Sequence, residues 1–193
     1  AAHAAGGGLC EGCAGSLPRA AVLAVPRAPG TPPVVVAGAY EGVLAEALNE
    51  YKERGRRELL PVLAGLLGRA VGVVAAEAPG AVLVPIPATR AARRERGFDH
   101  VAALCARVGP AHRCLRARPR PDSVGLSPAQ RRRAALSSLA VAPRQGAALA
   151  ASGRPVILVD DIVTTGATLS AAATALRRAG VGVAAAAAIA AVV

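Results

Sequence analysis

The feature that most constrains this chain is residues 156–169, where four aliphatic residues are followed by two aspartates, a hydroxyl-rich loop and a helical pattern. The run at 156–159 predicts a strand that is buried on both faces, and helical spacing over about 168–179 ends at a glycine. A second apolar run follows at 180–193, too short for a membrane helix and predicted to be buried sheet. This strand–helix–strand order implies a right-handed crossover and a parallel sheet, so the sequence predicts an α/β fold.

Two adjacent aspartates, Asp160 and Asp161, should emerge at the carboxyl end of this strand, where open α/β sheets bind their ligands. Carboxylates at the edge of an apolar strand are costly to leave unpaired. They can accept hydrogen bonds from the vicinal hydroxyls of a ribose. The pair therefore predicts a site for a sugar diol.

The next loop, residues 162–168, is short, rich in threonine and interrupted by a glycine, so its backbone amides can turn inward before the helix begins. Its hydroxyls can bind the same phosphate oxygens, and the helix dipole favours the negative charge. A diol site and a phosphate site one turn apart fit a ribose 5-phosphate. The glycine patterns of dinucleotide and nucleotide-triphosphate loops do not occur in the sequence. An alternative stays open, in which the aspartates cap the helix and the threonines fill a polar turn, although a cap needs one such residue.

Hydrophobic periodicity predicts most of the remaining elements. We expect strands at residues 34–37 and 81–84. We expect helices at about residues 41–54, 59–74 and 100–108. Two helices therefore precede the second strand, and a third helix follows it.

The chain divides by composition into two parts. Residues 1–33 are rich in glycine, alanine and proline and carry Cys10-Glu11-Gly12-Cys13, so we interpret them as a small cysteine knuckle and linker. A chain of 193 residues with 53% hydrophobic content can bury one main domain, which we place at 34–193. Its four cysteines make no disulfide framework at this length. We therefore expect a reducing, cytoplasmic location and no membrane span.

The formal net charge of +11 comes almost wholly from arginine, since Lys52 is the only lysine. This excess predicts an anionic partner, and charge alone leaves a polyphosphate substrate, a nucleic acid and an acidic protein open. Four arginines crowd the predicted loop after Pro85-Ile86-Pro87. Guanidinium groups bind phosphate oxygens bidentately, which suits a doubly charged leaving group, although arginine runs are as often solvated helix faces.

The whole string at 156–169 resembles the phosphoribosyl pyrophosphate motif of type I phosphoribosyltransferases. Other landmarks make the chain similar over nearly its whole length to the ComF family of competence-associated phosphoribosyltransferase-like proteins. They are Cys10-Glu11-Gly12-Cys13, Tyr40-Glu41-Gly42 with Lys52 downstream, Val84-Pro85-Ile86-Pro87 and Arg96-Gly97-Phe98. The resemblance implies a type I phosphoribosyltransferase-like twisted, mostly parallel sheet flanked by helices, with a small N-terminal cysteine-knuckle remnant.

The resemblance also implies roles for individual residues. Asp160 and Asp161 would bind the ribose hydroxyls and serve as the catalytic carboxylates. The 5-phosphate would be bound by Thr164, Thr165, Gly166, Ala167 and Thr168. Pyrophosphate, accompanied by Mg²⁺, would be bound by Pro87, Ala88, Arg90, Arg93 and Arg96. Cys10 and Cys13 would supply half of a zinc site that in the family is completed by a second cysteine pair upstream.

Two functions of different classes remain. The first is an enzyme that transfers the phosphoribosyl group of phosphoribosyl pyrophosphate to an unidentified acceptor. In purine-salvage relatives a carboxylate that assists the base stands where this chain has Thr164, so the resemblance argues against an ordinary purine acceptor. The alternative is a non-catalytic factor, which either senses phosphoribosyl pyrophosphate or acts with single-stranded DNA or a DNA-uptake protein. Only Tyr40, Tyr51 and Phe98 could stack on bases, so we expect weak, salt-sensitive nucleic-acid contact at most.

A basic, proline-containing stretch at 113–133 lies where type I enzymes carry a flexible hood over the site. Its core at residues 125–130 resembles the family pattern, while Ala134 replaces an expected asparagine. Closure over the site and incidental charge are both open interpretations. The oligomeric state is also left open.

Overall fold

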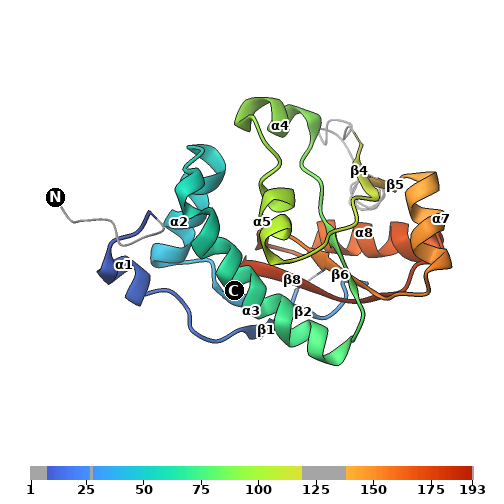
Figure 1. Ribbon diagram of the computed structural model, residues 1–193, viewed down its shortest axis with the longest axis horizontal. Coiled ribbons are helices and arrows are strands. Elements are labelled where there is room, and N and C mark those ends of the chain that lie inside the picture. The colour runs from blue at the N-terminus through green and yellow to red at the C-terminus, as the bar shows by residue number, and fades with distance from the viewer. Residues whose placement is uncertain (1–7, 27, 119–137, 193) are drawn as a thin grey trace.

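The protein is described by a computed structural model that covers residues 8–26, 28–118 and 138–192 (Figure 1). Within these residues a mixed sheet of six strands, most of them parallel, is flanked by helices. This arrangement confirms the predicted α/β class and is compatible with a Rossmann-like fold. The predicted hood core at 125–130 and Ala134 lie outside the described residues.

The sheet has the strand order β1-β2-β8-β6-β3, and β7 pairs with β8 beyond the end of β6. All neighbouring pairs are parallel except β1 with β2. The strands are β1 (Val22–Ala24), β2 (Val34–Ala39), β3 (Val82–Pro85), β6 (Val156–Val159), β7 (Ile162–Val163) and β8 (Val183–Ala191). The long strand β8 therefore lies at the centre, and the carboxyl ends of β6 and β3 are neighbours.

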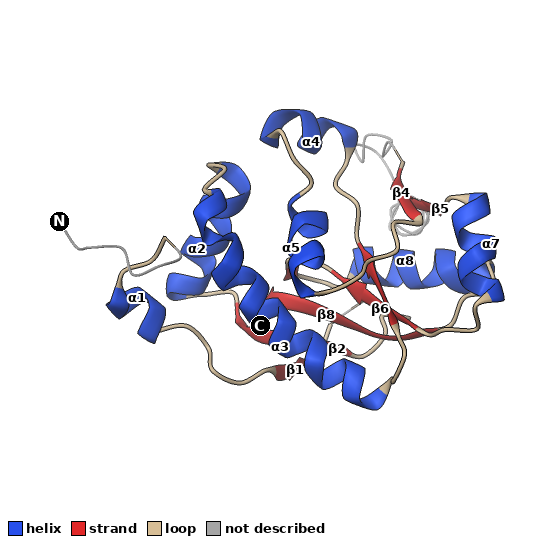
Figure 2. Ribbon diagram, viewed as in Figure 1, coloured by secondary structure: helices blue, strands red, loops and turns tan. Residues whose placement is uncertain are grey.

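Helices cover both faces of the sheet, as Figure 2 shows by secondary structure. The first core packs under α2 (Gly42–Glu53), the 3-10 turn η1 (Arg57–Leu59), α3 (Leu60–Glu77) and α5 (His100–Val108). The second core packs under α8 (Ala167–Arg178), α7 (Pro143–Ala151) and the small antiparallel pair β4 (Leu115–Ala117) and β5 (Leu139–Val141). The two cores are separated by the sheet alone.

The strand β6 supplies both cores, because successive side chains of a strand point to opposite faces. Ile157 and Val159 belong to the first core, and Val156 and Leu158 belong to the second. Each of these large aliphatic side chains contributes about 1.5–3 kcal/mol when it is fully buried. All four are at most 1% exposed, so the predicted doubly buried strand is confirmed.

The segment 90–96 differs from the expected loop. It forms the helix α4 (Arg90–Arg96), which begins at the N-cap Thr89, whose hydroxyl accepts a hydrogen bond from the Ala92 amide at 3.1 Å. It ends at Gly97, which has a φ of 73°. No residue of α4 is buried, so the arginines lie on an exposed helix rather than in an irregular loop.

The N-terminal segment adds structure that the sequence did not predict. A short helix, α1 (Glu11–Gly15), has Cys10 as its N-cap and contains Cys13, and β1 joins the main sheet as an edge strand. Arg69 of α3 donates to the carbonyl of Pro18 at 2.5 Å, which ties this segment to the domain. Residues 8–26 therefore pack onto the main domain.

One described helix, Arg57–Glu77, is long and apolar enough to cross a membrane by length and composition. In the fold, α3 packs against β8, β2 and α5 and buries side chains such as Leu63 and Leu67 in the first core. Core helices of globular proteins have the same composition. The predicted buried sheet at 180–193 is confirmed by β8.

Candidate functional site

The site is built where β6 ends and β7 begins. The two strands keep the same register against β8, with Val159 opposite Ala187 and Ile162 opposite Ala190. Asp160 and Asp161 lie between them, and the Asp160 amide still donates to the carbonyl of Ala187 at 3.1 Å. The chain bends here, and the two adjacent carboxylates have different surroundings: Asp160 lines a pocket beside α8, whereas Asp161 lies against Lys52 and His100.

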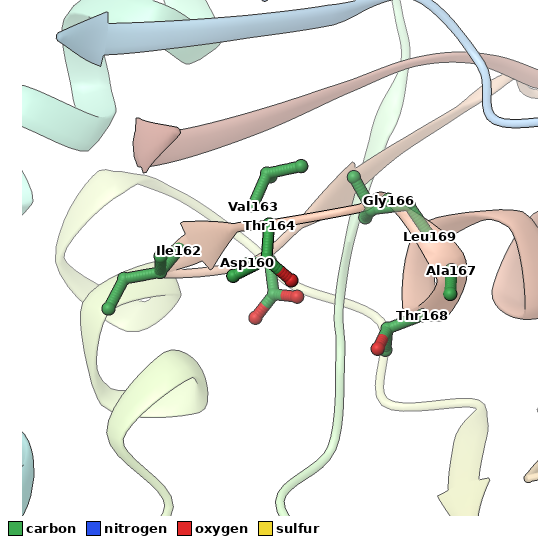
Figure 3. A pocket seen from close by; sticks show the side chains of 8 residues that line it. All are labelled: Asp160, Ile162, Val163, Thr164, Gly166, Ala167, Thr168 and Leu169. Carbon is green, nitrogen blue, oxygen red and sulfur yellow. The ribbon is translucent and has the colours of Figure 1, made fainter. Parts of the chain in front are cut away.

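Asp160 faces a pocket that encloses about 210 Å³ of empty space, including the open solvent at its mouth. Figure 3 shows that the Asp160 carboxylate and the Thr168 hydroxyl point to the same side of the loop. The pocket is lined by Asp160, Ile162, Val163, Thr164, Gly166, Ala167, Thr168 and Leu169. The structure thus brings together one predicted diol ligand and four of the five residues predicted to bind phosphate; Thr165 does not line the pocket.

The N-terminus of α8 forms one wall of this pocket. Gly166 is the N-cap, with a φ of 80°. The Thr165 hydroxyl accepts from the Ala167 amide at 3.3 Å, and the Ser170 amide donates to the Gly166 carbonyl at 2.9 Å. Within the described part of the chain, the amides of Thr168 and Leu169 have no acceptor. Unpaired first-turn amides together with the helix dipole are what bind a phosphate at a helix N-terminus.

The linker between β1 and β2 supports this loop through contacts that the sequence did not predict. We call Pro26 together with residues 28–31 the linker strap. The Ala28 amide donates to the Thr165 carbonyl at 2.8 Å, and the Thr31 hydroxyl lies 3.3 Å from the Gly166 carbonyl. A Cβ at Gly166 would come within 2.6 Å of Pro26, so the strap and the loop approach too closely for any side chain there. The linker thus fixes the loop conformation.

The other carboxylate, Asp161, is buried on the face covered by α2 and α5. One of its oxygens, Oδ2, lies 2.9 Å from Lys52 Nζ and 3.0 Å from His100 Nε2. Its other oxygen accepts from the Ile162 amide at 2.8 Å. The Asp161 side chain is only 6% exposed and does not line the pocket. Its predicted contact with ribose stays a prediction.

The surroundings shift the pKa values of the two carboxyl groups in opposite directions. Burial, and then the negative charge of Asp161, raise the pKa of Asp160 well above its ordinary range. Burial alone would also raise the pKa of Asp161, but the hydrogen bond from His100 and the charge of Lys52 outweigh it and hold this pKa below its ordinary range. Asp161 is therefore the permanently ionised member of the pair.

The predicted pyrophosphate loop begins beside Asp160. Pro85, at the end of β3, is in register with Val159, and the Ile86 amide donates to the Val159 carbonyl at 2.8 Å. Pro87 and Ala88 follow directly after this contact and do not line the pocket. The loop therefore leaves the sheet at the same edge as the two aspartates.

The three arginines predicted to bind pyrophosphate differ in their surroundings. Arg96 donates to Glu53 of α2, at 2.8 Å for the shorter contact. Arg93 lies 4.0 Å from Asp99. Arg90 is exposed and, among the residues that the structure describes, forms no ion pair. Of the three, Arg90 at the start of α4 is the one whose charge is free for a ligand.

The cysteine pair begins the short helix α1. Cys10 Sγ accepts from the Cys13 amide at 3.5 Å, and this hydrogen bond lowers the pKa of Cys10. In residues 8–26, 28–118 and 138–192, no three His, Cys, Asp or Glu side chains are grouped so that they could share a metal ion. Two thiols are half of a structural zinc site. Cys105 and Cys114 are buried, unpaired thiols elsewhere in the domain.

No family model matches the chain, and no curated protein matches it. The functional assignment therefore depends on the geometry of the pocket. A carboxylate at a strand end and the open amides of a helix N-terminus line the same hollow. This arrangement can accept hydrogen bonds from hydroxyls at one end and bind an anionic group at the other.

Proposed function

We propose that this chain binds the ribose 5-phosphate part of phosphoribosyl pyrophosphate in the Asp160 pocket and transfers the phosphoribosyl group to an acceptor. The proposal includes a type I phosphoribosyltransferase-like fold and membership of the ComF family. The observation that carries it is the shared pocket of Asp160 and the first turn of α8. One end suits a diol, and the other suits a phosphate monoester.

The charge distribution supports binding of a diphosphate leaving group on the side of the pocket next to the loop after β3. The loop after β3 starts next to Asp160, and Arg90 stands at the N-terminus of α4 beyond it. Mg²⁺ fits this site by its donor set, because it is usually held by one or two carboxylates together with substrate phosphates, and Asp160 would supply the carboxylate. When bound, the ion would neutralise the charge that develops on the departing pyrophosphate.

The proposed reaction breaks the bond between C1 of the ribose and the pyrophosphate oxygen and forms a bond from C1 to the acceptor. Asp160 would hold the ribose hydroxyls, and the amides of Thr168 and Leu169 would hold the 5-phosphate, so that the sugar is fixed at both ends. Arg90 would stabilise the leaving group electrostatically. The proton of the acceptor would leave to solvent.

A second candidate is a sensor that binds the same ligand without turnover. Among the described residues that line the pocket, Asp160 is the only carboxylate, and Thr164 stands where purine-salvage relatives have an acidic residue. A site that holds ribose and phosphate but activates no acceptor would act as a receptor for phosphoribosyl pyrophosphate. Pyrophosphate release with a panel of bases and amines separates the two candidates.

The single-stranded DNA alternative has less support from side-chain packing. Tyr51 is fully buried, and its ring packs edge-on against Phe98 with the ring centroids 5.4 Å apart. Phe98 is also covered by the guanidinium of Arg57, 4.8 Å from the ring centroid. Two of the three aromatic side chains are therefore engaged within the protein, which leaves Tyr40 as the remaining candidate for base stacking.

Calorimetric titration of the full chain with phosphoribosyl pyrophosphate and Mg²⁺ tests the proposal. We expect saturable 1:1 binding that falls at least about tenfold in Asp160→Asn, because a hydrogen bond to a charged group contributes about 1.5–3 kcal/mol. Glu46→Gln, an exposed substitution on α2, is the matched control and should bind as the unmodified chain does. Absence of binding by the unmodified chain would reject the proposal.

A further inference from the structure

One cluster of buried titratable groups has no role in the proposed function. Lys52 of α2, His100 of α5 and Asp161 meet at the carboxyl end of β6. Their side chains are 17%, 7% and 6% exposed, respectively. His100 Nδ1 is buried and finds no hydrogen-bond partner in the described part of the chain. Asp161 directly follows Asp160, whose carboxylate faces the pocket.

Stability does not explain this cluster. Burying an ion pair costs desolvation that the attraction between the charges often fails to recover, and apolar residues of similar volume are frequently as stable. The unpaired His100 Nδ1 adds a further cost. What the cluster does achieve is geometric, because two close ion-pair contacts from two different helices, at 2.9 and 3.0 Å, fix the position of the Asp161 carboxylate.

The geometry connects this anchor to the pocket through the backbone. The Asp161 amide donates to Asp160 Oδ1 at 3.0 Å, and the Asp161 carbonyl accepts from Ile189 and Ala190 of β8 at 3.0 and 3.1 Å. The two anchoring helices are themselves linked, because the Tyr51 hydroxyl donates to the His100 carbonyl at 3.1 Å. Fixing the Asp161 side chain therefore also fixes the turn between the two aspartates and, with it, the direction of the Asp160 side chain.

We propose that Lys52 and His100 are positioning residues for the ribose site. By binding Asp161 on the face of the sheet covered by α2 and α5, they hold Asp160 toward the pocket. This inference rests on the proposed function, since it concerns the same Asp160. His100 acts through Nε2–H, which must carry the proton in order to donate to an ionised carboxylate. Neither residue touches the ligand.

The test compares two probes, ribose 5-phosphate and inorganic phosphate, on the full chain. Phosphate needs only the first turn of α8, whereas ribose 5-phosphate also needs Asp160, so the ratio of their affinities measures the positioning of Asp160. We expect the unmodified chain to prefer ribose 5-phosphate at least about tenfold. Lys52→Met and His100→Phe should reduce the preference to about threefold or less, with phosphate affinity changed by less than about twofold. His100→Gln should keep more of the preference than His100→Phe does, because the glutamine amide can donate at the Nε2 position.

The matched control is Arg54→Met, which removes a positive charge near the end of the same helix. Arg54 is 76% exposed and pairs with Glu50, not with Asp161, so this variant should keep the full preference. If Lys52→Met does not fold, Asp161→Asn provides the second variant. It retains the side-chain volume and the acceptor for Ile162 but removes the charge that Lys52 binds, and it should lose the preference as well.

The outcomes separate this inference from the proposed function. An unmodified chain without any preference for ribose 5-phosphate would overturn both. A preference that Asp160→Asn abolishes but that Lys52→Met, His100→Phe and Asp161→Asn all retain would overturn the positioning role alone. An equal loss of affinity for both probes in the Lys52 and His100 variants would also overturn it, because that pattern reports general damage to the site.

Discussion

Replacing Asp160 by Asn should stabilise the protein without ligand and weaken ligand binding at the same time. The carboxylate is held beside the ionised Asp161, and burial and that charge raise the pKa of Asp160. Asn keeps the oxygen that accepts from the Asp161 amide and removes the negative charge. The substitution therefore relieves repulsion without removing the hydrogen bond.

The size of the effect follows from linkage between protonation and folding. Each unit by which folding raises the pKa of a carboxyl group costs about 1.4 kcal/mol of stability once the group is ionised. For Asp160→Asn near pH 7.5 we expect a net gain in the free energy of unfolding, which is this cost reduced by the attraction of Lys52. In a protein of this size each kcal/mol gained raises the melting temperature by about 2–4 °C.

The stability difference between Asp160→Asn and the unmodified chain should depend on pH in a defined direction. A raised pKa penalises the folded state above the folded-state pKa, and the penalty disappears below the unfolded value of about 3.9. The advantage of Asp160→Asn should therefore vanish as the pH falls toward about 4 and grow as the pH rises toward the raised pKa of Asp160. Urea unfolding at several pH values measures it, with Glu46→Gln as a control for removal of an exposed charge. A variant less stable than the unmodified chain at pH 7.5 would refute the reasoning.

Three further predictions concern the neighbouring groups. Gly166→Ala should cost about 2–3 kcal/mol in urea unfolding, because Ala must adopt a positive φ and its Cβ meets Pro26, and a cost below about 0.5 kcal/mol would contradict this account. Asp161→Asn should flatten acid unfolding, because a lowered pKa gives stability that is present above pH ~4 and lost below it; an unchanged acid transition would count against the anchor. Arg90→Ala should weaken phosphoribosyl pyrophosphate binding about tenfold and leave ribose 5-phosphate unaffected, with Arg94→Ala as control; equal weakening of both ligands would contradict its assignment to pyrophosphate.

Local patterns made much of the fold predictable. The strand β6 is a continuous aliphatic run, and the helices α2, α3 and α5 bury apolar residues with a clear period, so their positions follow from the sequence. The helix α4 has no such period, since it buries no side chain and exposes three of its four arginines. The edge strand β1 is equally exposed. Hydrophobic periodicity cannot predict elements that have no buried face.

The candidate site was predictable only where it is continuous in the chain. Asp160 and the loop up to Thr168 follow one another, and their shared pocket was expected. The support from Thr31 and the anchoring of Asp161 by Lys52 and His100 join residues far apart in sequence, and no local pattern reports such contacts. Lys52, the only lysine among many arginines, was the one available hint.

The account depends most on the Asp160 pocket as a ribose 5-phosphate site. The most direct measurement is a ¹H–¹⁵N spectrum of the full chain during titration with ribose 5-phosphate. We predict saturable shifts of the Thr168 and Leu169 amides, which have no acceptor within the described residues, and of the Asp161 amide beside Asp160. The Cys13 amide, far along the chain in α1, should not move. Saturation without shifts at Thr168 and Leu169, or no saturation at all, would contradict the account.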